Sequence, residues 1–129
     1  MEIMVAFIIL SISFIGLMQS FPFGLSMNKD AENETVSSYL AQEKIEELVS
    51  LGYGGVNTGS IEEKHRLSDD PSNFLYNFQR QTNVSYVDEN LNNSVSDLGI
   101  KKIIITVFYP NAISKEEKSY NITTLISER

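Results

Sequence analysis

The chain lacks cysteine, has a single histidine and carries few basic residues. Without cysteine it forms neither a disulfide bond nor a thiolate-based metal or catalytic centre, so packing alone has to hold the folded state. The one histidine, His65, lies in a polar segment, and the sequence identifies no acid–base partner for it. Because a catalytic histidine requires such a partner, these absences argue against an enzyme.

Basic side chains are outnumbered by acidic ones, ten against seventeen, and the net charge is −7. They form no cluster that could neutralise phosphates, so we expect no nucleic-acid partner. The sequence has no glycine-rich phosphate loop, nucleophile elbow or HExxH motif, so we expect neither a cofactor nor catalysis. The acids of the polar segments are not spaced like the ligands of a calcium loop, and we expect no metal site. These acids are Asp69, Asp70, Asp88, Glu89 and Asp97.

Charge is absent altogether from Ile3 to Met18. With the residues up to Leu25, this apolar run reaches the ~20 residues with which a helix crosses a ~30 Å hydrocarbon core. It has neither the basic start nor the small-residue cleavage site of a secretory signal peptide. We therefore expect residues 3–25 to span a membrane once. Glu2 lies at the start of the run, and an acid in a membrane segment is a functional hypothesis by default.

The stretch from Glu2 to Ile12, EIMVAFIILSI, resembles the N-terminal methylation motif of type IV pilins and type II secretion pseudopilins. The resemblance implies a structural subunit, most like a small minor one, that polymerises through its apolar helix into a surface fimbrium or a periplasmic secretion filament. It also implies a single pass through the bacterial inner membrane, with the C-terminal domain outside the cytoplasm.

The resemblance further implies a set of partners: sibling pilins or pseudopilins, the inner-membrane platform protein, the assembly ATPase and the prepilin peptidase. In this family the glutamate serves filament assembly. A carboxylate in a low-dielectric bundle is tolerated when a cation pairs with it. Glu2 would therefore pair with the α-amino group of a neighbouring subunit and fix the axial register of the filament.

Members of that family are made with a short basic leader that ends in glycine, and several residues precede the glutamate. Here Met1 directly precedes Glu2. Two explanations stay open: the start was assigned to an internal methionine, or the leader and the first mature residues were removed. In both cases we expect the prepilin peptidase to act on the full precursor, upstream of Met1.

Three residues are expected to break the apolar helix in an assembled filament, namely Gly16, Pro22 and Gly24. Proline removes a backbone hydrogen bond and clashes with the preceding turn, and glycine lowers helix propensity by ~1 kcal/mol. In an isolated subunit the helix is expected to continue with a bend. The break would separate a transmembrane and filament-core half, residues 1–25, from an exported globular domain, residues 26–129.

Within the globular domain the spacing of apolar residues changes along the chain. From 30 to 51 they recur every three or four residues, which predicts a helix that ends before Gly52. Residues 53–73 are rich in glycine, serine, asparagine and aspartate and are expected to form a loop. Alternating or β-branched runs predict strands at about 78–87, 100–109 and 119–126. The expected fold is therefore α+β and pilin-like, with a long N-terminal helix packed on an antiparallel sheet of three or four strands. Ile45 and Ile104 are expected in its core.

An alternative of a different class also fits the sequence. The chain could be a single-pass, membrane-anchored binding module that never polymerises, such as an adhesin or a competence DNA-uptake component. Glu2 discriminates between the two hypotheses, because a plain anchor needs no acid at that position.

Overall fold

The computed structural model describes residues 2–128, which form one long helix and an antiparallel sheet. Helix α1 spans Glu2–Ser50 and is followed by the single turn α2, Gly52–Gly55. The remaining elements are β1 (Gly59–Arg66), the 3-10 helix η1 (Phe74–Asn77), β2 (Gln79–Val87), β3 (Asn93–Ser94), β4 (Ile100–Pro110) and β5 (Glu117–Ser127). The expected α+β fold class is confirmed.

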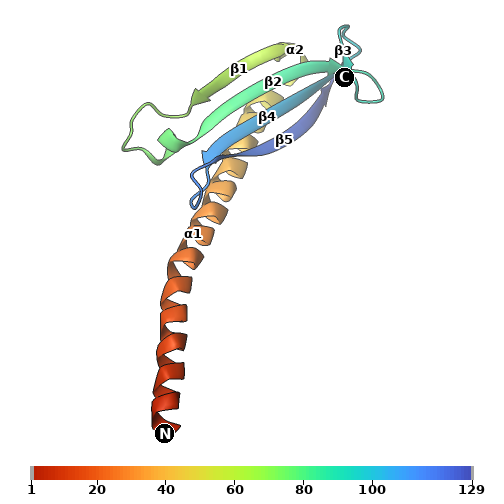
Figure 1. Ribbon diagram of the computed structural model, residues 1–129. Coiled ribbons are helices and arrows are strands. Elements are labelled where there is room, and N and C mark those ends of the chain that lie inside the picture. Colours follow the sequence, from red (N-terminus) through yellow and green to blue (C-terminus); the bar gives the residue numbers. More distant parts are fainter. Residues whose placement is uncertain (1, 129) are drawn as a thin grey trace.

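The sheet has five strands in the order β1–β2–β4–β5, with the two-residue β3 paired to β2. All strand pairs are antiparallel. The C-terminal part of α1 packs on one face of the sheet, whereas residues 2–25, named the stalk below, project beyond it (Figure 1). The β4–β5 turn lies at the end of the sheet near the stalk, and the β2–β4 connection lies at the opposite end (Figure 1).

Strand β4 supplies the centre of the core. Its side chains alternate between the two faces, and Ile103 and Ile105 on the helix side are fully buried. They belong to one cluster with Ala41 of α1, and Ile45 packs against that cluster as expected. The expectation for Ile104 is wrong, because Ile104 lies on the opposite face and is only half-buried. Three consecutive isoleucines carry no alternation, so the sequence does not fix which of them faces the helix.

The segment 53–73, expected to be a loop, contains the helical turn α2 and strand β1. β1 reads GSIEEKHR, a mainly charged and polar segment in which Ile61 is the single β-branched residue and no residue is a Phe, Tyr or Trp. It lies at the edge of the sheet, is almost entirely exposed and has two register shifts against β2. An edge strand pairs with a neighbour on one side only and commonly carries charged side chains. The residue types of β1 therefore did not predict a strand. With β1 and the short β3, the sheet has more strands than the three or four expected.

Helix α1 runs without interruption through Gly16, Pro22 and Gly24, so the single chain has no break at these residues. The proline removes one hydrogen bond from a helix that is intact on both sides. Figure 1 shows the helix axis changing direction between the stalk and the part on the sheet. The break was predicted for the assembled filament, where it stays a prediction. The helix ends as expected before Gly52, whose φ of 69° is the left-handed conformation of a glycine C-cap.

Candidate functional site

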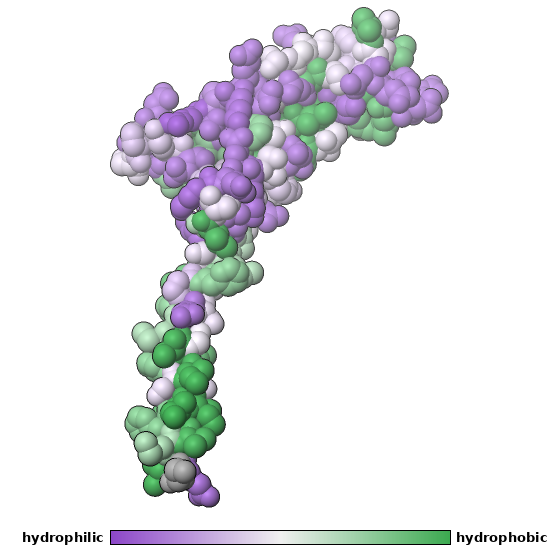
Figure 2. Space-filling model, in the orientation of Figure 1, coloured by the Kyte–Doolittle hydropathy of each residue, from purple (hydrophilic) through white to green (hydrophobic). Residues whose placement is uncertain are grey.

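The stalk is exposed over its whole length, and most of its side chains are large and apolar. Ile3 is 82% exposed and Phe21 is 70% exposed. Figure 2 shows this apolar surface in green below a domain that is mainly purple. At 1.5 Å per residue the stalk is about 36 Å long, enough for a hydrocarbon core of ~30 Å. By length and composition, α1 is able to span a membrane.

The three serine side chains of the stalk bond to the helix that carries them. The hydroxyls of Ser11 and Ser13 each donate to the carbonyl four residues earlier, at 2.8 Å. The hydroxyl of Ser20 donates to the carbonyl of Gly16 at 2.9 Å. Polar groups in lipid or in a dry helix bundle have to be satisfied internally. The hydroxyls of these serines therefore need no partner outside the helix when the stalk faces an apolar environment.

Glu2 lies in the first turn of α1, at the outer end of the stalk. A carboxylate there is stabilised by the partial positive charge at the helix N-terminus. Among residues 2–128 no side chain donates a hydrogen bond to it, and the rest of the stalk lies between it and the globular domain. Gly16, Pro22 and Gly24 lie further along the same rod, so the fold does not bring the four predicted residues together. All four are separate positions along one helix.

The globular domain forms hydrogen bonds with α1 directly after the stalk. The carboxylate of Asp30 accepts hydrogen bonds from the backbone N–H of Ala112 at 2.5 Å and from Lys118 at 2.9 Å. The amide of Asn33 donates to the carbonyl of Pro110 at 3.2 Å. The bond from the Ala112 N–H, with that from Lys118, holds the pKa of the Asp30 carboxyl below its usual range. The β4–β5 turn is thereby tied to the point where the stalk begins.

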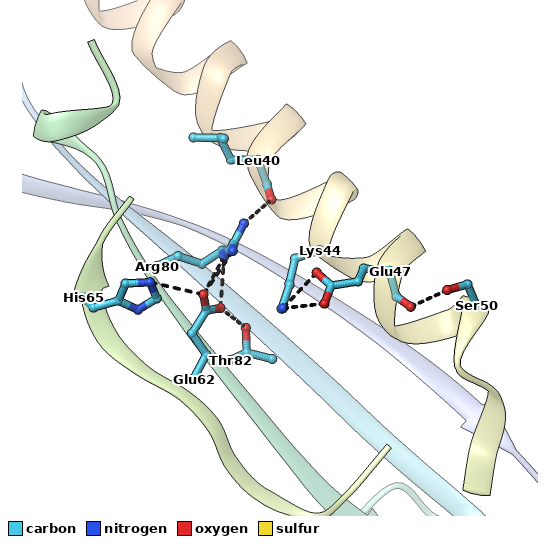
Figure 3. Close-up of polar contacts among 8 residues, drawn as sticks. All are labelled: Leu40, Lys44, Glu47, Ser50, Glu62, His65, Arg80 and Thr82. Carbon is cyan, nitrogen blue, oxygen red and sulfur yellow. Dashed lines mark hydrogen bonds and ion pairs between the residues drawn. The ribbon is translucent and has the colours of Figure 1, made fainter. Parts of the chain in front are cut away.

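A second polar cluster joins α1 to the edge strand β1 and is drawn in Figure 3. Arg80 donates from Nε and Nη2 to the two oxygens of Glu62, at 2.9 and 3.0 Å, and from Nη1 to the carbonyl of Leu40 in α1 at 3.4 Å. Thr82 donates to Glu62 at 2.8 Å. His65 Nε2 lies 3.5 Å from the same carboxylate. One acid thus links two strands, and its arginine partner reaches the helix.

The electrostatics of this cluster do not suit a general base. Burial would raise the pKa of the Glu62 carboxyl, but hydrogen bonds from Arg80 and Thr82 outweigh it and hold the pKa below its ordinary value of 4.5. An ionised carboxylate whose oxygens are already occupied by donors has no lone pair directed at a substrate. The cluster is a structural clamp.

Sequence reasoning missed a buried cation near the end of α1. Lys101 is 5% exposed, and its ammonium donates to the carbonyls of Tyr53 and Val56 at 2.8 and 2.7 Å. The ammonium also lies 4.0 Å from the centre of the Tyr53 ring. These contacts satisfy carbonyls at the end of the helical segment, which favours positive charge there. The sequence does place Lys101 two residues before Ile103, on the same face of the predicted strand, and this spacing indicated that Lys101 is buried.

The other acids considered from the sequence are dispersed over separate turns. Asp70 bonds to Ser72, Asp88 to Asn92, and Asp97 accepts a hydrogen bond from the backbone of Gly99. Within residues 2–128, no group of three or more histidine, aspartate or glutamate side chains is arranged to hold a metal ion.

No protein-family model, curated protein or solved structure matches this chain. The likeness to pilins is therefore one of shape: a long apolar N-terminal helix whose second half packs on an antiparallel sheet. The feature available for function is the stalk, an exposed apolar rod with an acid at its end.

Proposed function

We propose that the chain is a structural subunit of a type IV pilus or type II secretion pseudopilus and polymerises through the stalk. The observation that carries the proposal is the stalk itself, exposed from Glu2 to Leu25 while the domain behind it has its own core. Such a surface is stable in a membrane before assembly and among neighbouring stalks after it. One helix can thus serve as anchor and as filament core.

The attachment of the stalk also suits a filament subunit. A tethered binding module works with a flexible linker, whereas a subunit needs a fixed angle between its helix and its domain. Here α1 passes from stalk to sheet without interruption, and Asp30 and Asn33 hold the domain at that point. Packing of the stalks would therefore dictate where each domain lies.

Glu2 has a specific role in this proposal. Its carboxylate would pair with the α-amino group of an adjacent subunit, a contact that forms only in the assembly. An acid in a membrane segment raises the free energy of the monomer, and a paired acid fixes register between helices as a buried polar residue does in a coiled coil. The subunit would reside in the bacterial inner membrane and be drawn into the filament with sibling pilins by the platform protein and the assembly ATPase.

The test compares Glu2→Ala with the wild type in the full precursor, at matched expression, so that the free amine forms at the natural cleavage site. Incorporation into sheared filaments, or cross-linking to sibling subunits, is measured by immunoblot. Glu43→Ala, on the exposed face of α1, is the matched control. We expect membrane retention to be unchanged and incorporation to be lost in Glu2→Ala alone. Equal incorporation of both variants would instead favour the non-polymerising anchored module.

A further inference from the structure

A groove of about 600 Å³, named the base groove below, opens where α1 leaves the sheet. Its apolar lining includes Val36 of α1, Phe74 of η1, Pro110 at the end of β4 and Ala112 of the β4–β5 turn. Phe74 is 64% exposed although it is a large aromatic residue. Exposed apolar surface gathered in a concave site marks a place where another molecule binds.

The base groove differs in charge from the rest of the chain. Lys29, Lys115 and one acid, Glu32, line it. Lys29 pairs with Glu32 at 2.9 Å, so the net positive charge of the lining is that of Lys115. The chain as a whole carries −7. The groove therefore favours an apolar partner that is acidic around its contact point.

The β2–β4 connection at the opposite end of the sheet has these properties. This segment, residues 88–99, is named the distal loop, and it contains no lysine or arginine but three acids, Asp88, Glu89 and Asp97. It also exposes three apolar side chains: Val95 at 100%, Leu98 at 57% and Leu91 at 51%.

One of these apolar residues is held outward at a conformational cost. Leu91 has a φ of 64°, a region that residues with a side chain rarely adopt. The carboxylate of Asp88 fixes this turn by accepting the backbone N–H groups of Asn90 and Asn92 at 2.9 and 2.8 Å. Strain of this kind persists where the surrounding structure enforces it, and it is concentrated at functional sites.

We propose that the distal loop of one copy of this chain docks into the base groove of the next. An apolar, acidic projection then meets an apolar groove with a net positive lining, and the two lie at opposite ends of the same sheet (Figure 1). The inference rests on the proposed function, because subunits of a filament or a membrane all point their stalks the same way. A head-to-tail contact preserves that direction.

The contact is heterologous, since it joins two different surfaces of the same chain. In a pair of copies it leaves one groove and one loop unused, so further copies add beyond the dimer, as an open series or, where the rotation between copies closes, as a ring. A two-fold pairing of identical surfaces across an axis normal to the sheet would point the two stalks in opposite directions. That alternative is incompatible with a common membrane.

The absence of cysteine allows a direct test by paired cysteines in the full-length precursor, expressed in its native host. Val95→Cys is combined with Phe74→Cys, both at exposed positions, and membranes and sheared filaments are oxidised before electrophoresis. The control combines Val95→Cys with Tyr39→Cys, which is 69% exposed but lies outside the groove. We expect a ladder of covalent oligomers beyond the dimer from the first pair, and monomers from the control pair and from each single variant.

A charge exchange provides the second measurement. In the cysteine-paired chain, Glu89→Lys and Lys115→Glu should each reduce the ladder, and together they should restore it. Lys102→Glu, the same charge change on the outer face of the sheet, should leave the ladder intact. A ladder that stops at the dimer, or no ladder in membranes or filaments, overturns the docking inference. If filaments still form and Glu2→Ala still fails to enter them, the proposed function stands without it.

Discussion

Replacing Ile105 by alanine tests which face of β4 forms the core. Ile105 is fully buried and pairs across the sheet with Thr82 and Ile122. Removal of its three outer carbons leaves a cavity that strands held on both sides cannot close, so we expect a loss of about 3–4 kcal/mol in the free energy of unfolding. Ile104→Ala is the matched control, with the same atoms removed from the next residue on the half-buried face. It should cost about 1 kcal/mol.

The two variants are compared in the same buffer by urea and thermal unfolding, followed by circular dichroism because the chain has no tryptophan. For a domain of ~100 residues, a loss of 3 kcal/mol lowers the Tm by roughly 12 °C or more. The total stability of such a domain is ~5–15 kcal/mol, so Ile105→Ala should remain folded at low temperature. Equal losses of unfolding free energy in the two variants would refute the assignment of Ile105 to the core face of β4. A larger loss in Ile104→Ala would show that Ile104 faces the core instead.

Two further predictions concern the globular domain. A fragment that starts at Met27 should be soluble, folded and monomeric at micromolar concentration, as measured by sedimentation. It lacks the apolar stalk, and without aligned stalks the effective concentration of the distal loop near a base groove is too low for docking. Aggregation of the fragment under mild conditions would count against a self-sufficient core. Glu62→Gln should destabilise this fragment by about 2 kcal/mol at pH 7 through the loss of charge-assisted hydrogen bonds from Arg80. Because the pKa of Glu62 is lowered in the folded state, its contribution is present above pH 4.5 and disappears as the pH falls through the folded-state value. The difference between variant and wild type, measured by urea midpoints, should therefore shrink at low pH, and a constant difference would show that geometry and not charge is responsible.

The sequence predicts the elements whose stabilisation is local or repetitive. The β-branched and aromatic run from Ile103 to Tyr109 identifies β4, and the three- to four-residue spacing from Val36 to Leu48 identifies the half of α1 that packs on the sheet. β1 was missed because what holds it is distant in sequence: Glu62 pairs with Arg80, eighteen residues later. A pattern of residue types within one strand contains no information about such a contact.

The candidate site divides in the same way. Glu2 and the apolar stalk were recognised from a continuous motif. The hydrogen bonds from the stalk serines to carbonyls four residues earlier follow from helical spacing alone. The base groove was not foreseen, because Val36, Phe74 and Ala112 meet only after the chain has crossed the sheet. Lys101 was likewise unforeseen, since its partners are carbonyls of a turn that the sequence presents as a loop.

The attachment of α1 to the sheet also determines how the protein would respond to a pulling force. Tension along the stalk reaches the domain through Asp30 and Asn33 and through the packed side chains behind them. The second half of α1 lies along the sheet face (Figure 1), so the load would slide one surface across another and oppose all of these contacts at once. An interface whose contacts must all break at the same time withstands a larger force than one whose contacts break one after another. The hydrogen bonds between strands would bear little of the load, so the helix–sheet interface would set the force at which the domain separates from its helix.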